Sequence, residues 1–208
     1  MAFVRNLSPY KRTNQPAFEE SYKYWLEEEL KKIERSVETM QDVYNPSYLG
    51  AFYDTTTQVA ATVNTPQAVT FNNISYEYGV YRGTPTSRVY FDNRGFYNLE
   101  FALQIAHISS AAGSDVVLWV NFNGTPYPDS ATRVHVRGVN QDIVASWNLV
   151  GEAQPTNYVE LMWQTTDVDT VLLAEPATLT YPAIPSARMT LTQIAKWLWT
   201  PYTHTPKT

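Results

Sequence analysis

The period of the hydrophobic pattern changes near residue 45, and this change divides the chain into a helical part and a β-rich part. After Pro16, which suits the first turn of a helix, residues 17–40 contain no glycine or proline and are rich in Glu, Lys and Leu. From residue 49 onward the period is two, with frequent turn residues. We therefore expect an extended arm over residues 1–16, a helix and linker over 17–45, a β-domain over 46–195 and an aromatic tail over 196–208.

Apolar side chains recur within the helix at spacings of four, three, four and three. They are Leu26, Leu30, Ile33, Val37 and Met40, and we call them the helix seam. The spacing is that of a heptad repeat, although an amphipathic helix packed on its own domain would show it too. About two and a half heptads are too few for a stable coiled coil. The seam therefore needs help from the domain that follows it, and a domain that assembles into trimers would supply that help. Two i,i+4 pairs, Glu27–Lys31 and Glu28–Lys32, are expected to support the helix.

Composition limits the partners of the chain. It holds 15 Tyr, 6 Trp and 8 Phe, while charged residues make up 17%, below the roughly 25% of ordinary domains, so we expect surface to be hidden against partners. A net charge of −5 argues against nucleic acid, and zero cysteines exclude disulfides and thiolate metal sites. No stretch nears the ~20 apolar residues of a membrane span, and the first residues lack a secretory signal. We expect no membrane insertion, and if the chain works outside a cell, we expect a larger carrier to bring it there.

Short strands fill the second part of the chain, and with no helix between them they predict a sandwich or a barrel. Turn residues at Asn93–Gly95, Asn123–Pro126 and Glu152–Pro155 separate several of them. The expected strands are 49–57, 67–72, 76–82, 86–91, 96–109, 115–123, 131–137, 142–150, 157–165, 169–174 and 187–194.

Residues 49–195 resemble the jelly roll shared by the globular head of complement's first component and tumour necrosis factor. The resemblance is closer still to phage virion proteins that carry this jelly roll as a knob. In those proteins a strand like 50–56 opens the domain, and segments like 85–88 and 172–175 recur inside it. A generic β-sandwich is the plain alternative. The motifs are Gly95-Phe96-Tyr97-Asn98-Leu99-Glu100-Phe101, Val117-Leu118-Trp119-Val120-Asn121-Phe122-Asn123-Gly124, Tyr158-Val159-Glu160-Leu161-Met162-Trp163 and Met189-Thr190-Leu191-Thr192.

The resemblance implies a mainly β fold, a single ten-stranded jelly roll preceded by the helix, and a tight homotrimer. The chain has no collagen-like stem, unlike the complement heads. We therefore expect a phage structural protein on the exposed surface of the virion, a short fibre or decoration protein. Its arm and helix would dock on capsid, portal or tail proteins, and its knob would face outward, where it could bind a host receptor or glycan. The alternative is a secreted or cell-surface module that binds carbohydrate or protein.

Catalytic and metal sites are thinly represented. Of the three histidines, His107 and His135 fall in expected strands and His204 in the tail, and no nucleophile elbow is present. We expect no enzyme and no cofactor, and for His107 the role of a pore-lining or a satisfied core histidine. Asp167 and Asp169 have the acid-x-acid spacing of a calcium site, although solvated loop carboxylates would look the same.

The tail and the loop tips are the remaining candidates for contact. Trp197, Trp199 and Tyr202 either pack beneath the β-domain or form a docking plug for another virion protein, since exposed Trp and Tyr are favoured interface anchors. If the knob is an adhesin, the exposed tips 72–73, 127–129 and 154–157 are expected to make the contact.

Overall fold

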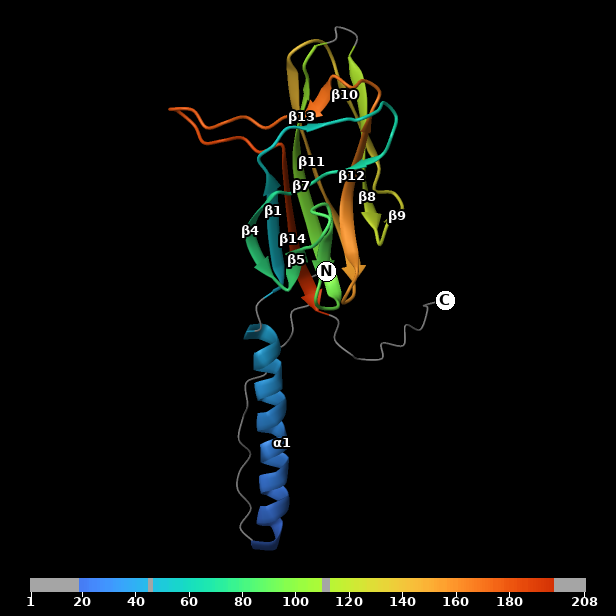
Figure 1. Ribbon diagram of the computed structural model, residues 1–208. Coiled ribbons are helices and arrows are strands. Elements are labelled where there is room, and N and C mark those ends of the chain that lie inside the picture. The colour runs from blue at the N-terminus through green and yellow to red at the C-terminus, as the bar shows by residue number, and fades with distance from the viewer. Residues whose placement is uncertain (1–18, 45–46, 110–112, 197–208) are drawn as a thin grey trace. The chain divides into compact units, whose positions relative to one another are not determined.

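The computed structural model describes residues 19–44, 47–109 and 113–196, and the chain divides into two compact units, Met1–Pro46 and Ser47–Thr208. The described residues of the first unit form one helix, α1 (Glu19–Tyr44), which confirms the expected N-terminal helix and continues it four residues past its expected end (Figure 1). The backbone of Met40 belongs to α1, but its side chain is outside the described residues. The expected arm and the aromatic tail are outside them as well.

Ion pairs on α1 join residues three apart rather than four apart. Lys31 Nζ lies 3.0 Å from Glu28 Oε1, and Lys32 Nζ lies 2.8 Å from Glu29 Oε1. The predicted i,i+4 partners were therefore wrong by one residue, because the long lysine side chains reach the nearer carboxylate on the preceding turn. Neighbours at both spacings share one side of a helix, so the expected support remains.

The described residues of the second unit form fourteen strands in two antiparallel sheets of seven (Figure 1). The first sheet contains β1 (Leu49–Asp54), β2 (Gln58–Val59), β4 (Asn73–Tyr78), β7 (Gly95–His107), β11 (Gln141–Ala153), β13 (Thr170–Leu172) and β14 (Ala187–Lys196). The second sheet contains β3 (Gln67–Ala68), β5 (Val80–Arg82), β6 (Val89–Phe91), β8 (Ser114–Phe122), β9 (Thr125–Pro126), β10 (Thr132–Val136) and β12 (Tyr158–Thr165).

The strand order shows how the chain crosses between the sheets. The longer strands of the first sheet lie in the order β11–β7–β14–β1–β4, and those of the second in the order β10–β8–β12–β6–β5. The chain changes sheet on both sides of β3, between β4 and β5, on both sides of β7, on both sides of β11, and after β12. Apart from the pairs β5–β6 and β8–β9, neighbours in a sheet are therefore not consecutive in sequence.

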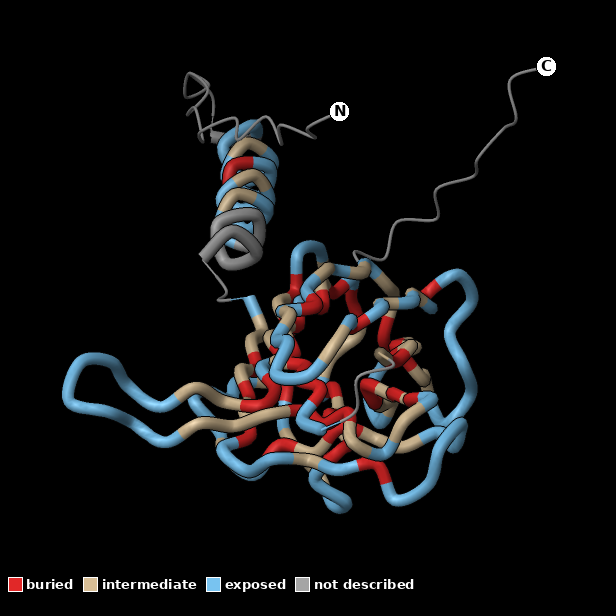
Figure 2. The backbone as a smooth tube through the Cα atoms, turned by 90° about the horizontal axis from the view of Figure 1, so that it is seen from above, coloured by how far each residue is buried: buried red, intermediate tan, exposed pale blue. Residues whose placement is uncertain are grey.

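The two sheets enclose one apolar core. Alternate residues of β1, β7, β8 and β14 are buried, as in β7, where Tyr97, Leu99 and Phe101 point inward. They join Leu118 and Trp163 of the second sheet in one continuous cluster. Figure 2 shows this alternation as buried segments enclosed by exposed loops.

The strand prediction was right for the long strands and wrong at several interruptions. Only residues 67–68 of the expected strand 67–72 pair as a strand. Beyond them alternate backbone N–H groups donate to side chains instead of a neighbouring strand: Thr70 to Gln58 Oε1 (2.9 Å) and Asn72 to Asp54 Oδ2 (3.1 Å). The expected strand 76–82 is broken at Gly79, where φ is +64°. Breaks of this kind, with the short strands β2 and β9, make the predicted count of ten strands too low.

The turn predicted around Asn123 and Gly124 is confirmed. Both residues have positive φ, +50° and +80°, as a tight two-residue hairpin requires. The turn joins β8 to β9, which pair through Phe122 and Thr125.

Candidate functional site

The helix seam is exposed in the single chain. Leu26, Leu30, Ile33 and Val37 are 40%, 55%, 40% and 46% exposed, while Glu29 on the same helix is buried. Apolar side chains at heptad spacing on one side of a helix are the arrangement that buries against a second helix. Helix α1 is too polar to cross a lipid bilayer.

The outer face of the first sheet is a second extended surface with little charge. Cross-strand registers place its residues in three adjacent rows of five, in which Glu100 and Arg188 are the charged members. Val150, Tyr76 and Tyr78 are about half exposed at the two edges of this face. The rows are Val150–Asn98–Thr192–Leu49–Tyr78, Asn148–Glu100–Thr190–Ala51–Tyr76 and Ser146–Ala102–Arg188–Tyr53–Asn73.

Polar side chains on this face bond to one another. Asn148 Nδ2 donates to Asn98 Oδ1 (3.0 Å), and Asn98 Nδ2 donates to Glu100 Oε1 (2.9 Å). Neutral side chains that bond to one another make this face less costly to desolvate than a face covered by lysine and glutamate. Such a surface is suited to contact with another protein.

The second sheet carries a row of tyrosines on its outer face that sequence reasoning missed. Tyr81, Tyr90 and Tyr158 lie on β5, β6 and β12, with ring centroids 5.6 Å apart for the first pair and 5.4 Å apart for the second. The guanidinium carbon of Arg88 lies 4.5 Å from the centroid of the Tyr158 ring. We call these four residues the tyrosine row.

Glu160 fixes the tyrosine row to the sheet. It is buried, and its Oε1 accepts hydrogen bonds from Ser87 Oγ (2.9 Å) and Arg88 Nε (3.3 Å). Hydrogen bonds from Arg88 to Tyr90 and to Glu160 raise the pKa of Arg88. Because rings and guanidinium cover one another, the row stabilises the sheet and offers ring edges to a ligand.

His107 is a satisfied core residue, one of the two roles predicted for it. Its ring is buried, with Nδ1 3.0 Å from the carbonyl oxygen of Gly138 and Nε2 3.3 Å from Asp167 Oδ2. Burial lowers the pKa of His107, but the bonds to Gly138 and Asp167 outweigh it and the pKa is raised. Ser109, two residues after His107 in the sequence, donates to Asp169 Oδ2. These contacts do not place a serine against a histidine base.

The carboxylates of Asp167 and Asp169 are engaged by protein donors. Asp167 Oδ1 accepts from the backbone N–H of Asp169 (3.0 Å), and its Oδ2 faces His107. Within the described ranges no group of three or more His, Asp or Glu side chains is arranged to hold a metal ion. Calcium binding stays a prediction, which titration calorimetry of the pure protein tests.

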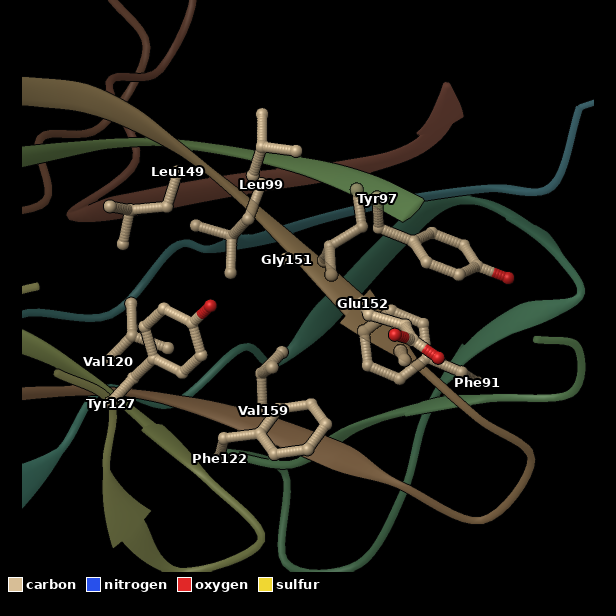
Figure 3. Close-up of a pocket in the computed structure, with 13 residues that line it drawn as sticks. Phe91, Tyr97, Leu99, Val120, Phe122, Tyr127, Leu149, Gly151, Glu152 and Val159 are labelled. Atoms are coloured by element: carbon tan, nitrogen blue, oxygen red, sulfur yellow. The ribbon is translucent and has the colours of Figure 1, made fainter. Parts of the chain in front are cut away.

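A narrow apolar crevice lies between the sheets beside β11 (Figure 3). Leu99, Leu149 and Val159 line it, and Phe122 and Tyr127 lie on one side. Its volume of about 40 Å³ has room for one or two waters and none for a substrate. Tyr97 lies at its far end, where the hydroxyl donates to the Asn93 carbonyl and burial raises the pKa to about 12.

Other predicted sites have different outcomes. The tips at 127–129 and 154–157 are mostly exposed, as expected, and His135 Nδ1 lies 2.7 Å from Asp115 Oδ1 on the surface. Trp197, Trp199, Tyr202 and His204 lie outside the described residues.

No protein-family model matches the chain, and no curated protein matches it significantly.

Proposed function

We propose that the chain is a homotrimeric structural protein of a phage virion, a short fibre or decoration protein. Residues 1–45 attach it to capsid, portal or tail, and the β-domain faces outward. One observation carries the proposal: four apolar residues at heptad spacing are exposed on α1, in a unit separate from the β-domain. A helix with this seam is most stable against copies of itself.

Energetics require the β-domain to take part. Complete burial of a leucine or isoleucine side chain contributes about 1.5–3 kcal/mol, and the seam residues have roughly half of their surface left to bury. That gain is small against the cost of bringing three chains together. The weakly charged outer face of the first sheet supports the same assembly, because it offers each β-domain a surface for contact with another chain.

The strand order supports a jelly roll of the kind found in complement heads and tumour necrosis factor. Two antiparallel sheets enclose one core, and the chain crosses from sheet to sheet at β7, β11 and β12 rather than completing one sheet first. Such crossing is typical of jelly rolls. In that family the knob is trimeric. A trimer agrees with the exposed apolar side chains of the helix seam, which need other chains to cover them.

Purified particles test the virion role. Mass spectrometry of the phage that encodes the chain should find it in the particle, in multiples of three, and gold-labelled antibody to the β-domain should mark fixed positions on head or tail. Absence of the chain from purified particles would contradict the proposal and favour a secreted or cell-surface binding module.

A further inference from the structure

A hairpin of residues 174–186 protrudes from the first sheet between β13 and β14 (Figures 1 and 2). Its base is closed by two backbone hydrogen bonds between Glu175 and Ile184, of 2.9 and 3.0 Å. Its tip is closed by the N–H of Thr178 donating to the carbonyl of Tyr181 (2.9 Å), and Thr178 Oγ1 accepts from the N–H of Thr180 (3.2 Å). The hairpin therefore has its own defined structure.

The tip of the hairpin is exposed and carries large apolar side chains. Leu179 is 106% exposed and Tyr181 is 46% exposed, and residues 176–183 carry no charge. Protein surfaces usually protect such segments with charged side chains. A protruding, uncharged hairpin with leucine at its tip has the form of a contact arm.

A groove lies where the hairpin leaves the first sheet. Ala102, Gln104, Val144 and Arg188 from the sheet form one part of its lining, and residues 181–185 of the hairpin form the other. Its volume of about 490 Å³ accepts several side chains. Val144 is 63% exposed there, so the chain's own described residues leave this apolar wall open.

We propose that the hairpin tip of one copy inserts Leu179 into this groove of the next copy. The proposal rests on the homotrimer proposed above and assigns its contact. Leu179 at the tip is not among the residues that line the groove, so the two halves of the contact can meet only head to tail between copies, an arrangement that closes into a ring under rotational symmetry. A second copy is the occupant because each chain presents both halves, and because the charge-free tip matches a groove with one charged side chain, Arg188.

Engineered disulfides test the contact in a chain that has no cysteine of its own. Full-length chains carrying Leu179→Cys and Val144→Cys, each with a different tag, are co-expressed and oxidised. We expect a disulfide joining the two tags, which is intermolecular by construction, and little cross-linking of either variant alone. Absence of the mixed disulfide in a sample that is trimeric by light scattering would overturn the contact and leave the trimer standing.

A second variant measures how much the contact contributes. Leu179→Ser should raise the concentration at which the trimer dissociates by about tenfold or more, because three leucines lose their burial. Val63→Ser, which removes another exposed aliphatic group outside the hairpin and the groove, should leave that concentration unchanged. Equal dissociation of both variants would contradict the contact, whereas a monomeric parent chain would contradict the trimer itself.

Discussion

The Nε2 atom of His107 lies 3.3 Å from Oδ2 of Asp167, and this contact joins the end of β7 to the loop between β12 and β13. The other ring nitrogen faces a carbonyl oxygen, that of Gly138, which can only accept. Both ring nitrogens therefore act as donors, and the protonated ring is the form that satisfies its surroundings. Stability should consequently depend on pH.

The pKa of His107 is raised in the folded protein. Its contribution should be fully present below the ordinary histidine pKa of about 6.5 and should be lost as pH rises through the higher folded value. Urea unfolding at fixed chain concentration, from pH 5 to pH 9, measures this dependence. Asp167→Asn keeps an acceptor but removes the charge, so it should flatten the curve, whereas His135→Asn on the surface should not. A parent curve that rises with pH over this window would contradict the assignment.

Gly79 cannot be replaced by alanine without a clash. Its φ is +64°, and a Cβ atom would lie 2.0 Å from Cδ1 of Tyr48, whose ring stacks on Tyr78. Gly138 is a matched control, with φ of +82° but no atom closer than 3.7 Å. Gly138→Ala should cost about 1–2 kcal/mol of unfolding free energy from backbone strain.

Gly79→Ala should cost clearly more than Gly138→Ala in the same assay, and adding Tyr48→Ala should recover part of the difference, because the clashing ring is gone. Equal losses for the two glycine variants would show that Tyr48 moves aside freely.

Glu160 should matter more to stability than a surface carboxylate in a similar ion pair. Glu160→Ala leaves Ser87 and Arg88 without their shared acceptor at a buried position, at a cost of about 1–3 kcal/mol. Glu152 pairs with Arg94 at 2.8 Å, but both side chains are about a third exposed, and Glu152→Ala should cost about 0–1 kcal/mol. Thermal unfolding of the two variants compares their stabilities. A larger loss of stability for Glu152→Ala than for Glu160→Ala would contradict the role given to Glu160.

The helix seam should be needed for association. Leu30→Ser with Ile33→Ser should shift sedimentation towards smaller species, since it removes two apolar groups from the centre of the seam. Glu28→Ser with Lys31→Ser, on the opposite side of α1, removes one exposed ion pair and should leave sedimentation unchanged. Equal behaviour of the two double variants would show that the seam does not associate.

Local patterns were sufficient to predict the helix, the long strands and the Asn123–Gly124 turn. The helix and the strands have a strong hydrophobic period, and a two-residue turn depends on its own backbone angles. The break of 67–72 depends instead on Asp54 and Gln58, whose side chains capture the backbone N–H groups. Such competition arises only when distant segments meet.

The candidate surfaces divide in the same way. The helix seam is visible in sequence because its residues lie three and four apart on one element. The tyrosine row is assembled by strand register, which brings Tyr81, Tyr90 and Tyr158 together. The one local signal is that Tyr81 and Tyr90 each follow a buried valine and so point outward.

The central claim is that the purified protein is a trimer. Light scattering at micromolar concentration measures its mass directly. The seam, the outer face of the first sheet and the protruding hairpin predict a mass three times the 23.7 kDa of one chain. A mass of 23.7 kDa under these conditions would contradict the trimer and every contact inferred for it.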